Sequence, residues 1–361
     1  MPKKKNNLLI AASGTGGHIF PALSIAEDID KQWHISWLGI QNRCECELVP
    51  KKYNLFKLKI HSPGKKNIFL IFQYLRIVFA TFHVIKILLK ERINLVFTTG
   101  GYISAPTILA SKILRVPIIL HESNLVPGTV TKYFGNMCNY LLTGFSETNK
   151  ILGYKNVIFT GTPLRKQFEI NHKLPDWVPF NSKPLILVMG GSQGAKGVND
   201  MFYDSLEFLL SEDFRVVHII GEDFKKKIYN KNSSNYIQIN FTNEMAALLQ
   251  NCDLVVSRSG SGTINELMAM KKPSILIPYP RSKNNHQEKN ALVLSSKGGA
   301  VLINQSEKSN LFLTKTLKRI FHSQVKDKYE ILDLMKKNMN KLDFKNPNSQ
   351  IINIINYFLK N

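Results

Sequence analysis

The sequence predicts an α/β protein with parallel sheets in two domains, and three observations lead to this prediction. The chain has 361 residues, more than one hydrophobic core usually serves. Short apolar segments typical of buried strands recur along it, and several are followed directly by a glycine-rich turn and a helical pattern. A polar, proline-bearing segment at 171–184 separates two such series and has the composition of a linker. We expect a first domain over 1–165, a second over 166–340, and a final helix in 341–361 that packs back on the first.

The composition is that of a globular protein with anionic partners. Hydrophobic residues make up 44% of the chain and charged residues 20%. Lysine and arginine number 48 against 26 acidic residues, a net charge of +22, which favours nucleic acid, an anionic membrane or phosphorylated substrates as partners. The four cysteines are scattered without paired ligand spacing, which argues against zinc and favours reduced thiols in the cytosol. The N-terminus runs straight into a strand, so we expect no signal peptide.

The first glycine turn follows the strand at 8–12. Ser13-Gly14-Thr15-Gly16-Gly17-His18 precedes a helix expected from about Pro21 to Ile29. The turn resembles the dinucleotide fingerprint, but Ile19 occupies the third glycine position and the next strand, 35–39, ends without an acidic residue. It therefore indicates a glycine loop that admits a bulky ligand, not a nicotinamide site. His18 is either a structural histidine or a group that takes a proton near neutral pH.

Two further strands of the first domain end in polar or glycine residues. The strand at 95–99 runs into Gly100-Gly101, and the strand at 117–120 runs into His121-Glu122. Open α/β sheets bind ligands outside the carboxyl ends of their strands. Glu122 at such an end is a base, a residue that orients a neighbour, or a helix cap, and the sequence leaves these alternatives open.

The most apolar stretch of the chain, 68–89, carries a basic stripe. On a helix, Arg76, His83, Lys86 and Lys90 fall on one narrow face, and Lys65 and Lys66 precede it. A helix that is apolar over most of its circumference with basic residues on one side suits a membrane interface. One or two buried helices under a short solvent face remain the alternative.

The second domain carries two candidate phosphate sites and a polar run. Gly190–Ala195 follows the strand at 185–189, and Ser257–Thr263 follows the strand at 254–256 and opens a helix. Helix starts present unpaired N–H groups that favour anions. Glu266, one turn in, either accepts hydrogen bonds from ribose hydroxyls or complements the helix dipole. The side chains of 284–290 suit the reading of sugar hydroxyls.

Seven motifs occur along the chain in this order: Gly14-Thr15-Gly16-Gly17-His18, Thr99-Gly100-Gly101-Tyr102, His121-Glu122-x-Asn124, Gly161-x-Pro163-x-Arg165, Gly190-Gly191-Ser192-Gln193-Gly194-Ala195, Arg258-Ser259-Gly260-x-x-Thr263-x-x-Glu266 and His286-Gln287-x-x-Asn290. Together they resemble the motifs of the MurG family, bacterial UDP-N-acetylglucosamine–undecaprenyl-pyrophosphoryl-muramoyl-pentapeptide N-acetylglucosaminyltransferases. The match covers nearly the whole chain. The resemblance implies a GT-B fold, in which two Rossmann-like, doubly wound parallel-sheet domains face a cleft. It also implies inverting transfer of GlcNAc from UDP-GlcNAc to the C4 hydroxyl of MurNAc in lipid I, giving lipid II for peptidoglycan synthesis.

The resemblance also assigns UDP-GlcNAc contacts to residues of both domains. Those of the first domain line the cleft or meet the donor sugar, and those of the second take the diphosphate, the nucleoside and the GlcNAc hydroxyls. The implied contacts are Thr15, Gly16 and Gly17 at the cleft; Asn124 at the donor sugar; Arg165 and Ser192 at the diphosphate; Thr242 at uracil; Ser261, Gly262, Thr263, Ile264, Asn265 and Glu266 at uridine, ribose and phosphate; and Gln287 and Asn290 at the GlcNAc hydroxyls.

The chemistry of inverting transfer needs one base and stabilisation of the departing UDP. His18 is the first candidate for the base and Glu122 the second. The only D-x-D string, Asp28-Ile29-Asp30, lies at the wrong end of a helix to hold a metal for the diphosphate. We therefore expect no metal at the chemical step and no cofactor, with helix N-terminal amides and Arg165 in its place.

A polyprenyl acceptor places the expected reaction at a membrane. The apolar and basic stretch at about 65–90 would hold the enzyme against the cytoplasmic face of the inner membrane, where a polyprenyl acceptor lies. A UDP-GlcNAc 2-epimerase, another membrane glycosyltransferase and a noncatalytic UDP-sugar sensor remain alternatives. We expect no nucleic-acid partner, because the chain shows neither a DNA-binding module nor aromatic and basic interleaving of the RNA-binding kind.

Overall fold

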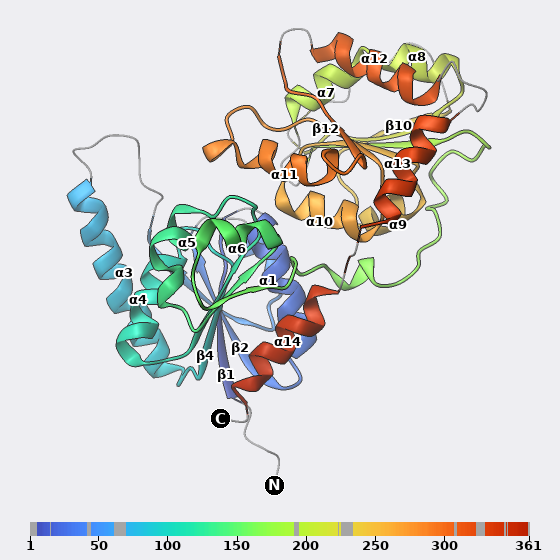
Figure 1. The fold of residues 1–361 in the computed structure, drawn as a ribbon. Coiled ribbons are helices and arrows are strands. Elements are labelled where there is room, and N and C mark those ends of the chain that lie inside the picture. The colour runs from blue at the N-terminus through green and yellow to red at the C-terminus, as the bar shows by residue number, and fades with distance from the viewer. Residues whose placement is uncertain are drawn as a thin grey trace. The chain divides into compact units, whose positions relative to one another are not determined.

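The computed structural model divides into two compact units (Figure 1). Unit 1 comprises Met1–Arg165 and Lys345–Asn361, and unit 2 comprises Lys166–Phe344. The structure describes residues 6–14, 16–41, 45–60, 70–190, 195–222, 224, 234–306, 309–322, 329–342, 344 and 346–359.

Unit 1 is a parallel sheet with helices on both faces. The seven strands are ordered β3-β2-β1-β4-β5-β6-β7, and every neighbouring pair runs parallel. Its elements are β1 (Asn6–Ala11), α1 (Gly16–Ile29), β2 (Trp33–Ile40), α2 (Glu45–Leu48), β3 (Asn54–Leu58), α3 (Leu70–Lys90), β4 (Leu95–Thr98), α4 (Ser104–Leu114), β5 (Ile118–Glu122), α5 (Thr129–Phe134), η2 (Gly135–Met137), β6 (Tyr140–Thr143), α6 (Ser146–Leu152), β7 (Val157–Phe159) and, from the end of the chain, α14 (Pro347–Tyr357).

Alternate residues of the unit 1 strands belong to two different cores. Leu8 and Ile10 pack with α1 and α14 on one face, and Leu9 and Ala11 pack with α3 and α4 on the other. Because successive strand side chains point to opposite faces, a strand buried on both faces is apolar throughout. This accounts for the continuous apolar runs in the sequence.

Unit 2 repeats the same plan with six parallel strands, ordered β10-β9-β8-β11-β12-β13. Helices α7, α8, α12 and α13 share one core with the sheet, and α9 and α10 lie on its other side (Figure 1). Its elements are η3 (Lys166–Phe168), β8 (Leu185–Met189), α7 (Lys196–Tyr203), α8 (Leu206–Ser211), β9 (Arg215–Ile219), β10 (Tyr236–Ile239), α9 (Met245–Asn251), β11 (Leu254–Ser257), α10 (Ser261–Ala269), β12 (Ser274–Leu276), η4 (Lys283–Asn285), α11 (His286–Ser295), β13 (Ala300–Leu302), α12 (Ser309–Phe321) and α13 (Glu330–Asn340).

Both sheets follow the Rossmann strand order, in which the chain starts in the middle and winds first one way and then the other. The predicted α/β class, with a Rossmann-like parallel sheet in each domain, is confirmed. One helix differs from the prediction: α1 begins at Gly16, and Pro21 lies inside it. Pro21 is the sixth residue of α1, so it has no N–H to donate to the carbonyl oxygen of Gly17, and the helix continues past this missing bond.

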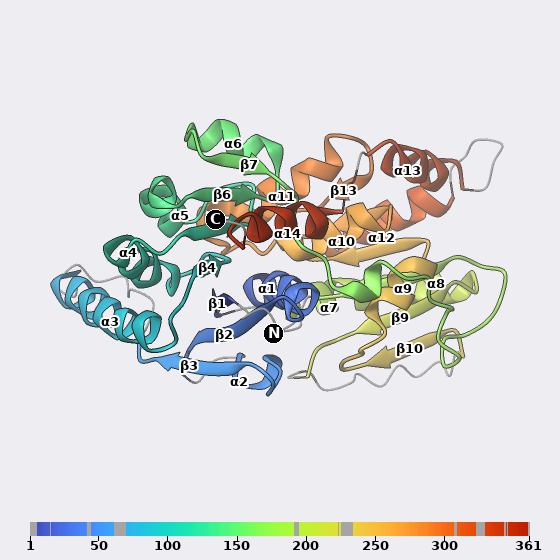
Figure 2. The same cartoon turned by 90° about the horizontal axis from the view of Figure 1, so that it is seen from below.

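The C-terminal helix α14 belongs to unit 1 and packs beside α1 (Figure 2). Its buried residues Ile351 and Ile355 join the core that α1 and the sheet form. Asn346 caps the helix, since its side chain accepts a hydrogen bond from the backbone N–H of Asn348, and Pro347 occupies the first turn. The chain therefore enters unit 1 a second time to complete its core.

Candidate active site

The strand order creates a switch point in unit 1 between β1 and β4, which are neighbours whose following segments leave in opposite directions. The first glycine turn follows β1, and Gly100 and Gly101 follow β4. Gly100 and Gly101 have φ values of +85° and +78°, which non-glycine residues rarely adopt. Gly14, at φ +106°, would place an added Cβ in open space. Thr15 lies outside the described residues, and Gly16 and Gly17 form the start of α1.

His18 has a defined tautomer at this switch point. Its Nδ1 lies 2.6 Å from the carbonyl oxygen of Thr99, and since a carbonyl only accepts, Nδ1 carries the proton. The hydroxyl of Thr99 donates in return to the carbonyl oxygen of His18 at 2.9 Å. The ring is half-buried and lies over the glycine pair, with Nε2 3.8 Å from the position of a Cβ on Gly101. Nε2 therefore bears the lone pair, the arrangement that a general base requires.

Glu122, at the end of β5, is buried and accepts four hydrogen bonds. Its Oε1 accepts from the backbone and side-chain N–H groups of Asn124 at 3.0 and 3.1 Å. Its Oε2 accepts from the N–H of Gly128 at 2.8 Å and the hydroxyl of Thr131 at 2.6 Å. Of the three interpretations open from the sequence, these contacts favour the one in which Glu122 organises the loop before α5. They also hold Asn124.

Arg165 ends unit 1, at the point where the chain first leaves it. Its guanidinium lies over the ring of Phe20, 4.9 Å from the ring centroid. Phe20 stands on α1, just after His18, so a cation–π contact ties the predicted diphosphate residue to the helix that begins at the glycine turn.

The corresponding switch point of unit 2 lies between β8 and β11. The predicted strand, turn and helix after β11 is confirmed: α10 starts at Ser261, with Gly260 as an N-cap that makes no side-chain capping bond. An added Cβ on Gly262 would meet nothing within 4 Å. The amides of Ser261, Gly262 and Thr263 therefore form an anion-accepting helix start. Ser192, after β8, lies outside the described residues.

The rest of the predicted α10 set divides by burial. Ile264 and Asn265 are buried, the first without exposed surface and the second with its Nδ2 donating to Ser261 O at 2.8 Å. The N–H of Ile264 is already bonded to Gly260 O at 3.0 Å. Glu266 is half-buried one turn beyond the helix start. The amides at the helix start and the half-buried Glu266 are therefore the groups of this segment that face a ligand in the predicted site.

Gln287 and Asn290 lie on α11, which starts after two asparagines in the left-handed region. The Oε1 of Gln287 accepts from the N–H of Tyr279 at 2.9 Å, so this bond uses its acceptor and not its NH₂ donor group. Asn290 is fully buried, and its Nδ2 donates to Ser259 O at 3.3 Å. Thr242, before α9, accepts from the N–H of Glu244 at 3.0 Å through its hydroxyl.

A buried arginine network, which the sequence did not reveal, supports these loops. Arg258 donates to the carbonyl oxygens of Ile277 and Pro278 at 3.1 and 3.0 Å and to Gln305 Oε1 at 2.8 Å. Its guanidinium also lies 5.6 Å from the ring centroid of Tyr279. Burial lowers the pKa of Arg258, while the charge of nearby Tyr279 raises it, and a guanidinium stays charged near neutral pH. Gln305 follows β13 and lies outside all seven motifs. Of the residues in this network, only Arg258 belongs to a motif, so the sequence did not predict the bond between the two.

Each unit contains a buried neutral histidine. Burial lowers the pKa of His121 from 6.5 to about 4, although its Nε2–H donates to Gly161 O at 2.9 Å. Burial lowers the pKa of His218 from 6.5 to about 3. His218 Nε2 lies 3.1 Å from Asn199 Oδ1, and its Nδ1 lies 3.1 Å from the hydroxyl of Tyr236. Both nitrogens of each ring have partners, which distinguishes these histidines from His18.

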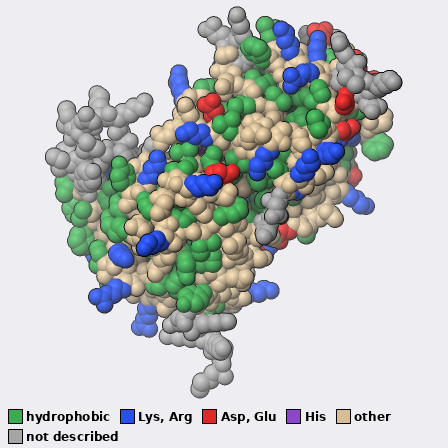
Figure 3. Space-filling view, in the orientation of Figure 1, with side chains coloured by type: hydrophobic (Ala, Val, Ile, Leu, Met, Phe, Trp, Pro, Cys, Tyr) green, Lys and Arg blue, Asp and Glu red, His purple; other side chains and the backbone are tan. Residues whose placement is uncertain are grey.

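Helix α3 presents a mixed apolar and basic surface. Its buried side contributes Ala80, Val84, Ile87 and Leu88 to the core. Figure 3 shows hydrophobic side chains along the edge of the molecule where α3 lies in Figure 1. Among the helices that the structure describes, none is both long and apolar enough to cross a membrane. Lys65 and Lys66 lie outside the described residues. The exposed apolar residues of α3 are Leu75, Val78, Phe79, Phe82 and Leu89, and all four members of the predicted basic stripe, Arg76, His83, Lys86 and Lys90, are exposed.

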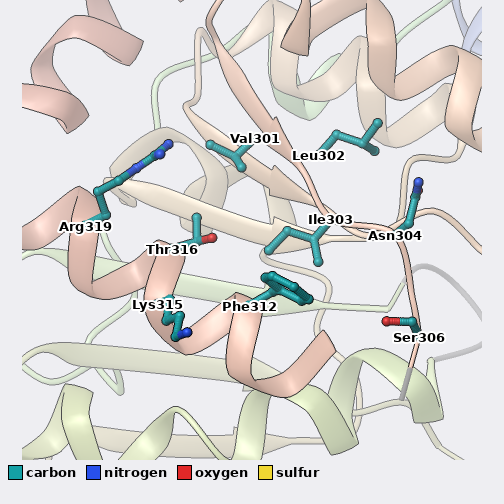
Figure 4. A pocket seen from close by; sticks show the side chains of 9 residues that line it. All are labelled: Val301, Leu302, Ile303, Asn304, Ser306, Phe312, Lys315, Thr316 and Arg319. Atoms are coloured by element: carbon teal, nitrogen blue, oxygen red, sulfur yellow. The ribbon is translucent and has the colours of Figure 1, made fainter. Parts of the chain in front are cut away.

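A pocket of about 490 Å³ lies in unit 2, and none of the residues that line it is a predicted site residue (Figure 4). It is bordered by the edge strand β13 and the loop that follows it on one side and by α12 on the other. Its lining residues are Val301, Leu302, Ile303, Asn304, Ser306, Phe312, Lys315, Thr316 and Arg319.

The acidic residues of the D-x-D string have structural partners. Asp28 accepts from Asn348 Nδ2 at 2.9 Å, and Asp30 pairs with Lys52 at 2.5 Å. Within the described ranges, no group of three or more histidine, cysteine, aspartate or glutamate side chains is arranged to hold a metal ion.

The chain is similar to known glycosyltransferases over most of its length. The model of the glycosyltransferase family 28 N-terminal domain matches residues 8–143, and that of the C-terminal domain matches 185–349. Proteins named UDP-N-acetylglucosamine–N-acetylmuramyl-(pentapeptide) pyrophosphoryl-undecaprenol N-acetylglucosamine transferase match in Prochlorococcus marinus subsp. pastoris MED4 (60% identity, 100% of both chains) and P. marinus AS9601 (61%, 99% of both). The crystal structure of Acinetobacter baumannii MurG is similar at 22% identity with a TM-score of 0.78, covering 98% of this chain and 100% of that one.

Proposed function

The chain belongs to glycosyltransferase family 28 and, within it, to the MurG family, and on this premise we propose that it transfers GlcNAc from UDP-GlcNAc to the C4 hydroxyl of MurNAc in lipid I, giving lipid II for peptidoglycan synthesis. The observation that carries the assignment is the identity of about 60% over the whole length to transferases named for this pair of substrates. The product has one new β-glycosidic bond, and UDP leaves.

The donor binds largely through unit 2. The diphosphate meets the amides at the start of α10, Ser192 and Arg165, and Glu266 accepts hydrogen bonds from the ribose hydroxyls. Thr242 contacts uracil through its backbone. The NH₂ group of Gln287, whose Oε1 accepts from the N–H of Tyr279, donates to a GlcNAc hydroxyl. Ile264, Asn265 and Asn290 act from inside the fold by shaping these segments, since their side chains are buried.

His18 is the base of the reaction. Its Nε2 takes the proton of the C4 hydroxyl as that oxygen attacks the anomeric carbon on the face opposite UDP, so the configuration inverts. The Thr99 carbonyl stabilises the imidazolium through Nδ1–H. The negative charge that develops on the departing UDP is stabilised by the α10 amides and Arg165, without a metal. Glu122, which accepts four hydrogen bonds, organises the Asn124 loop and is the weaker candidate for the base.

The enzyme acts as a peripheral protein on the cytoplasmic face of the inner membrane. The exposed Phe79 and Phe82 of α3 insert among lipids beside Arg76, Lys86 and Lys90, which attract anionic headgroups. Sedimentation with anionic vesicles tests this contact. The double change Phe79→Ser and Phe82→Ser is expected to release the protein, whereas Phe180→Ser in unit 2, where the side chain is 93% exposed, is expected to leave binding unchanged. Equal binding of both variants would exclude α3 as the contact.

The reaction is tested with radiolabelled UDP-GlcNAc and a soluble lipid I analogue in the presence of EDTA. Labelled disaccharide product is expected from the wild type, with a β linkage that NMR identifies. Product that forms only when divalent metal is restored would contradict the metal-free mechanism. Normal UDP-GlcNAc binding without product would contradict the lipid I assignment and favour an epimerase or another acceptor.

A further inference from the structure

Asn348 is a buried amide in the first turn of α14 that joins segments far apart in the chain. It is 2% exposed, and its side chain contacts Ser24 and Asp28 of α1 together with Leu164. All of these residues belong to unit 1, and Leu164 immediately precedes Arg165. A buried polar side chain is costly unless it is hydrogen-bonded, so a residue this well bonded fixes the position of whatever it contacts.

The amide of Asn348 uses both its acceptor and its donors. Its Oδ1 accepts from the N–H of Leu164 at 3.1 Å. Its Nδ2 donates to Ser24 Oγ at 2.8 Å, to Asp28 Oδ2 at 2.9 Å and to Leu164 O at 3.2 Å. Ser24 Oγ in turn donates to Leu164 O. The peptide groups on both sides of the Leu164 Cα are therefore held by α14 and α1.

These hydrogen bonds fix the backbone position of Arg165. The carbonyl of Leu164 and the nitrogen of Arg165 share one planar peptide, so fixing Leu164 O fixes where Arg165 begins. The far end of Arg165 lies over Phe20. Phe20, Ser24 and Asp28 are spaced four residues apart and lie on one face of α1. One helix face thus holds Arg165 at its backbone and at its guanidinium.

A second contact of α14 supports the same segment. Gly161 has a φ of +82°, and a Cβ added there would lie 3.2 Å from Cγ of Pro347. The first turn of α14 therefore packs closely against the segment from Gly161 to Leu164. The position of Arg165, in the middle of the chain, thus depends on Pro347 and Asn348 near the C-terminal end of the sequence.

We propose that Asn348 is a positioning residue for the transfer reaction: it fixes the Leu164–Arg165 peptide against α1 so that Arg165 meets the donor diphosphate. The proposal rests on the proposed function through the role given to Arg165. It explains why an amide stands at this position. Aspartate has no donor for Ser24, Asp28 and Leu164 O, and alanine leaves the N–H and C=O of Leu164 one partner short.

The test compares Asn348→Ala with changes of the same helix that leave Leu164 untouched. Transfer kinetics and UDP affinity by calorimetry are measured for N348A, and for Ile355→Val and Ile355→Ala, which remove core packing of α14 to two extents. We expect N348A to lower UDP affinity and kcat/KM about tenfold, because a displaced binding group loses most of its contribution. The Ile355 variants are expected to lose thermal stability but to keep the UDP affinity of the wild type.

A double-mutant cycle decides whether Asn348 acts through Arg165. If it does, Asn348→Ala combined with Arg165→Ala weakens UDP binding no further than Arg165→Ala alone. Additive losses, or a UDP affinity that follows thermal stability across the Ile355 variants as well, would overturn the proposal. Wild-type protein that binds UDP but transfers no GlcNAc would instead overturn the proposed function, and the calorimetry would still decide the role of Asn348.

Discussion

The two units share one topology but differ in what stands at the switch point. In unit 1, two glycines of positive φ bring the chain close to a half-buried histidine with one open nitrogen. In unit 2, the same place holds a helix start without a capping side chain, backed by the buried Arg258 network. One arrangement suits proton transfer, and the other suits the binding of an anion.

In both units the sheet fixes where the candidate site lies, and the loops after the strands carry the groups that bind or react. The central strands of the two units are alike, since β4 and β5 in unit 1 and β8 and β11 in unit 2 are buried along their whole length. The loops that follow them are not. Variants at the two switch points therefore separate the proposed proton transfer in unit 1 from the proposed donor binding in unit 2.

The largest effect is expected from His18→Ala, which removes the proposed base. The rate kcat should fall by about 10²–10⁴-fold, the usual contribution of a positioned general base, while UDP affinity stays near that of the wild type. His34→Ala, on the exposed side of β2, is the matched control and should keep full activity. A UDP affinity that falls in step with kcat would mean that unit 1 binds the donor rather than performing the chemistry.

The free energy of unfolding is expected to fall by a few kcal/mol on acidification, because each unit contains a buried histidine. The folded pKa values of His121 and His218 are about 4 and about 3, below the unfolded value of 6.5, so the unfolded state binds more protons in between. The contribution of the two neutral histidines to stability is fully present above about pH 6.5. It is lost as the pH falls from there to about 4 for His121 and to about 3 for His218.

Melting temperatures measured between pH 7 and pH 4 check this expectation. The slope of melting temperature against pH should be smaller in His121→Gln and in His218→Gln than in the wild type, whatever the melting temperature of each variant at pH 7. A slope that is unchanged in both variants would mean that other groups cause the acid sensitivity.

The sequence was sufficient for the strands and for the glycine turns that follow them. Buried parallel strands leave continuous apolar runs, and a glycine turn between strand and helix marks the carboxyl end of a strand. The start of α1 was predicted too late because Pro21 resembles a first-turn proline, whereas a glycine-rich first turn can extend the helix before it.

The tertiary contacts were out of reach of the sequence. Nothing local links Gln305 to Arg258, or Asn348 to Leu164, because these bonds join segments separated by whole helices. The tautomer of His18 likewise depends on the carbonyl of Thr99, 81 residues further along the chain, in the turn after β4. Sequence motifs identify residue types at loop positions, whereas the partners that orient them are set by the sheet order.

A moderate effect is expected from Glu266→Ala in unit 2. Loss of a charge-assisted hydrogen bond to the ribose should lower UDP affinity by about 10- to 100-fold and raise KM for UDP-GlcNAc, with a smaller change in kcat. Glu330→Ala, at the exposed start of α13, is the control for removing a carboxylate. The contrast with His18→Ala is sharpest in calorimetry, where only the Glu266 change should be visible.

The smallest effects come from adding one methyl group at each switch point. Gly101→Ala forces alanine to a φ of +78°, which should cost about 1–2 kcal/mol of stability and lower the melting temperature. Gly262→Ala lies in α10 with open space around it, where alanine should stabilise the helix by up to about 1 kcal/mol. The same methyl would stand where the diphosphate is proposed to approach the amides, so UDP affinity should fall although the protein melts later. A Gly262→Ala protein that is stabilised and binds UDP normally would separate the helix start of α10 from the donor site and leave the anion to the loop after β8.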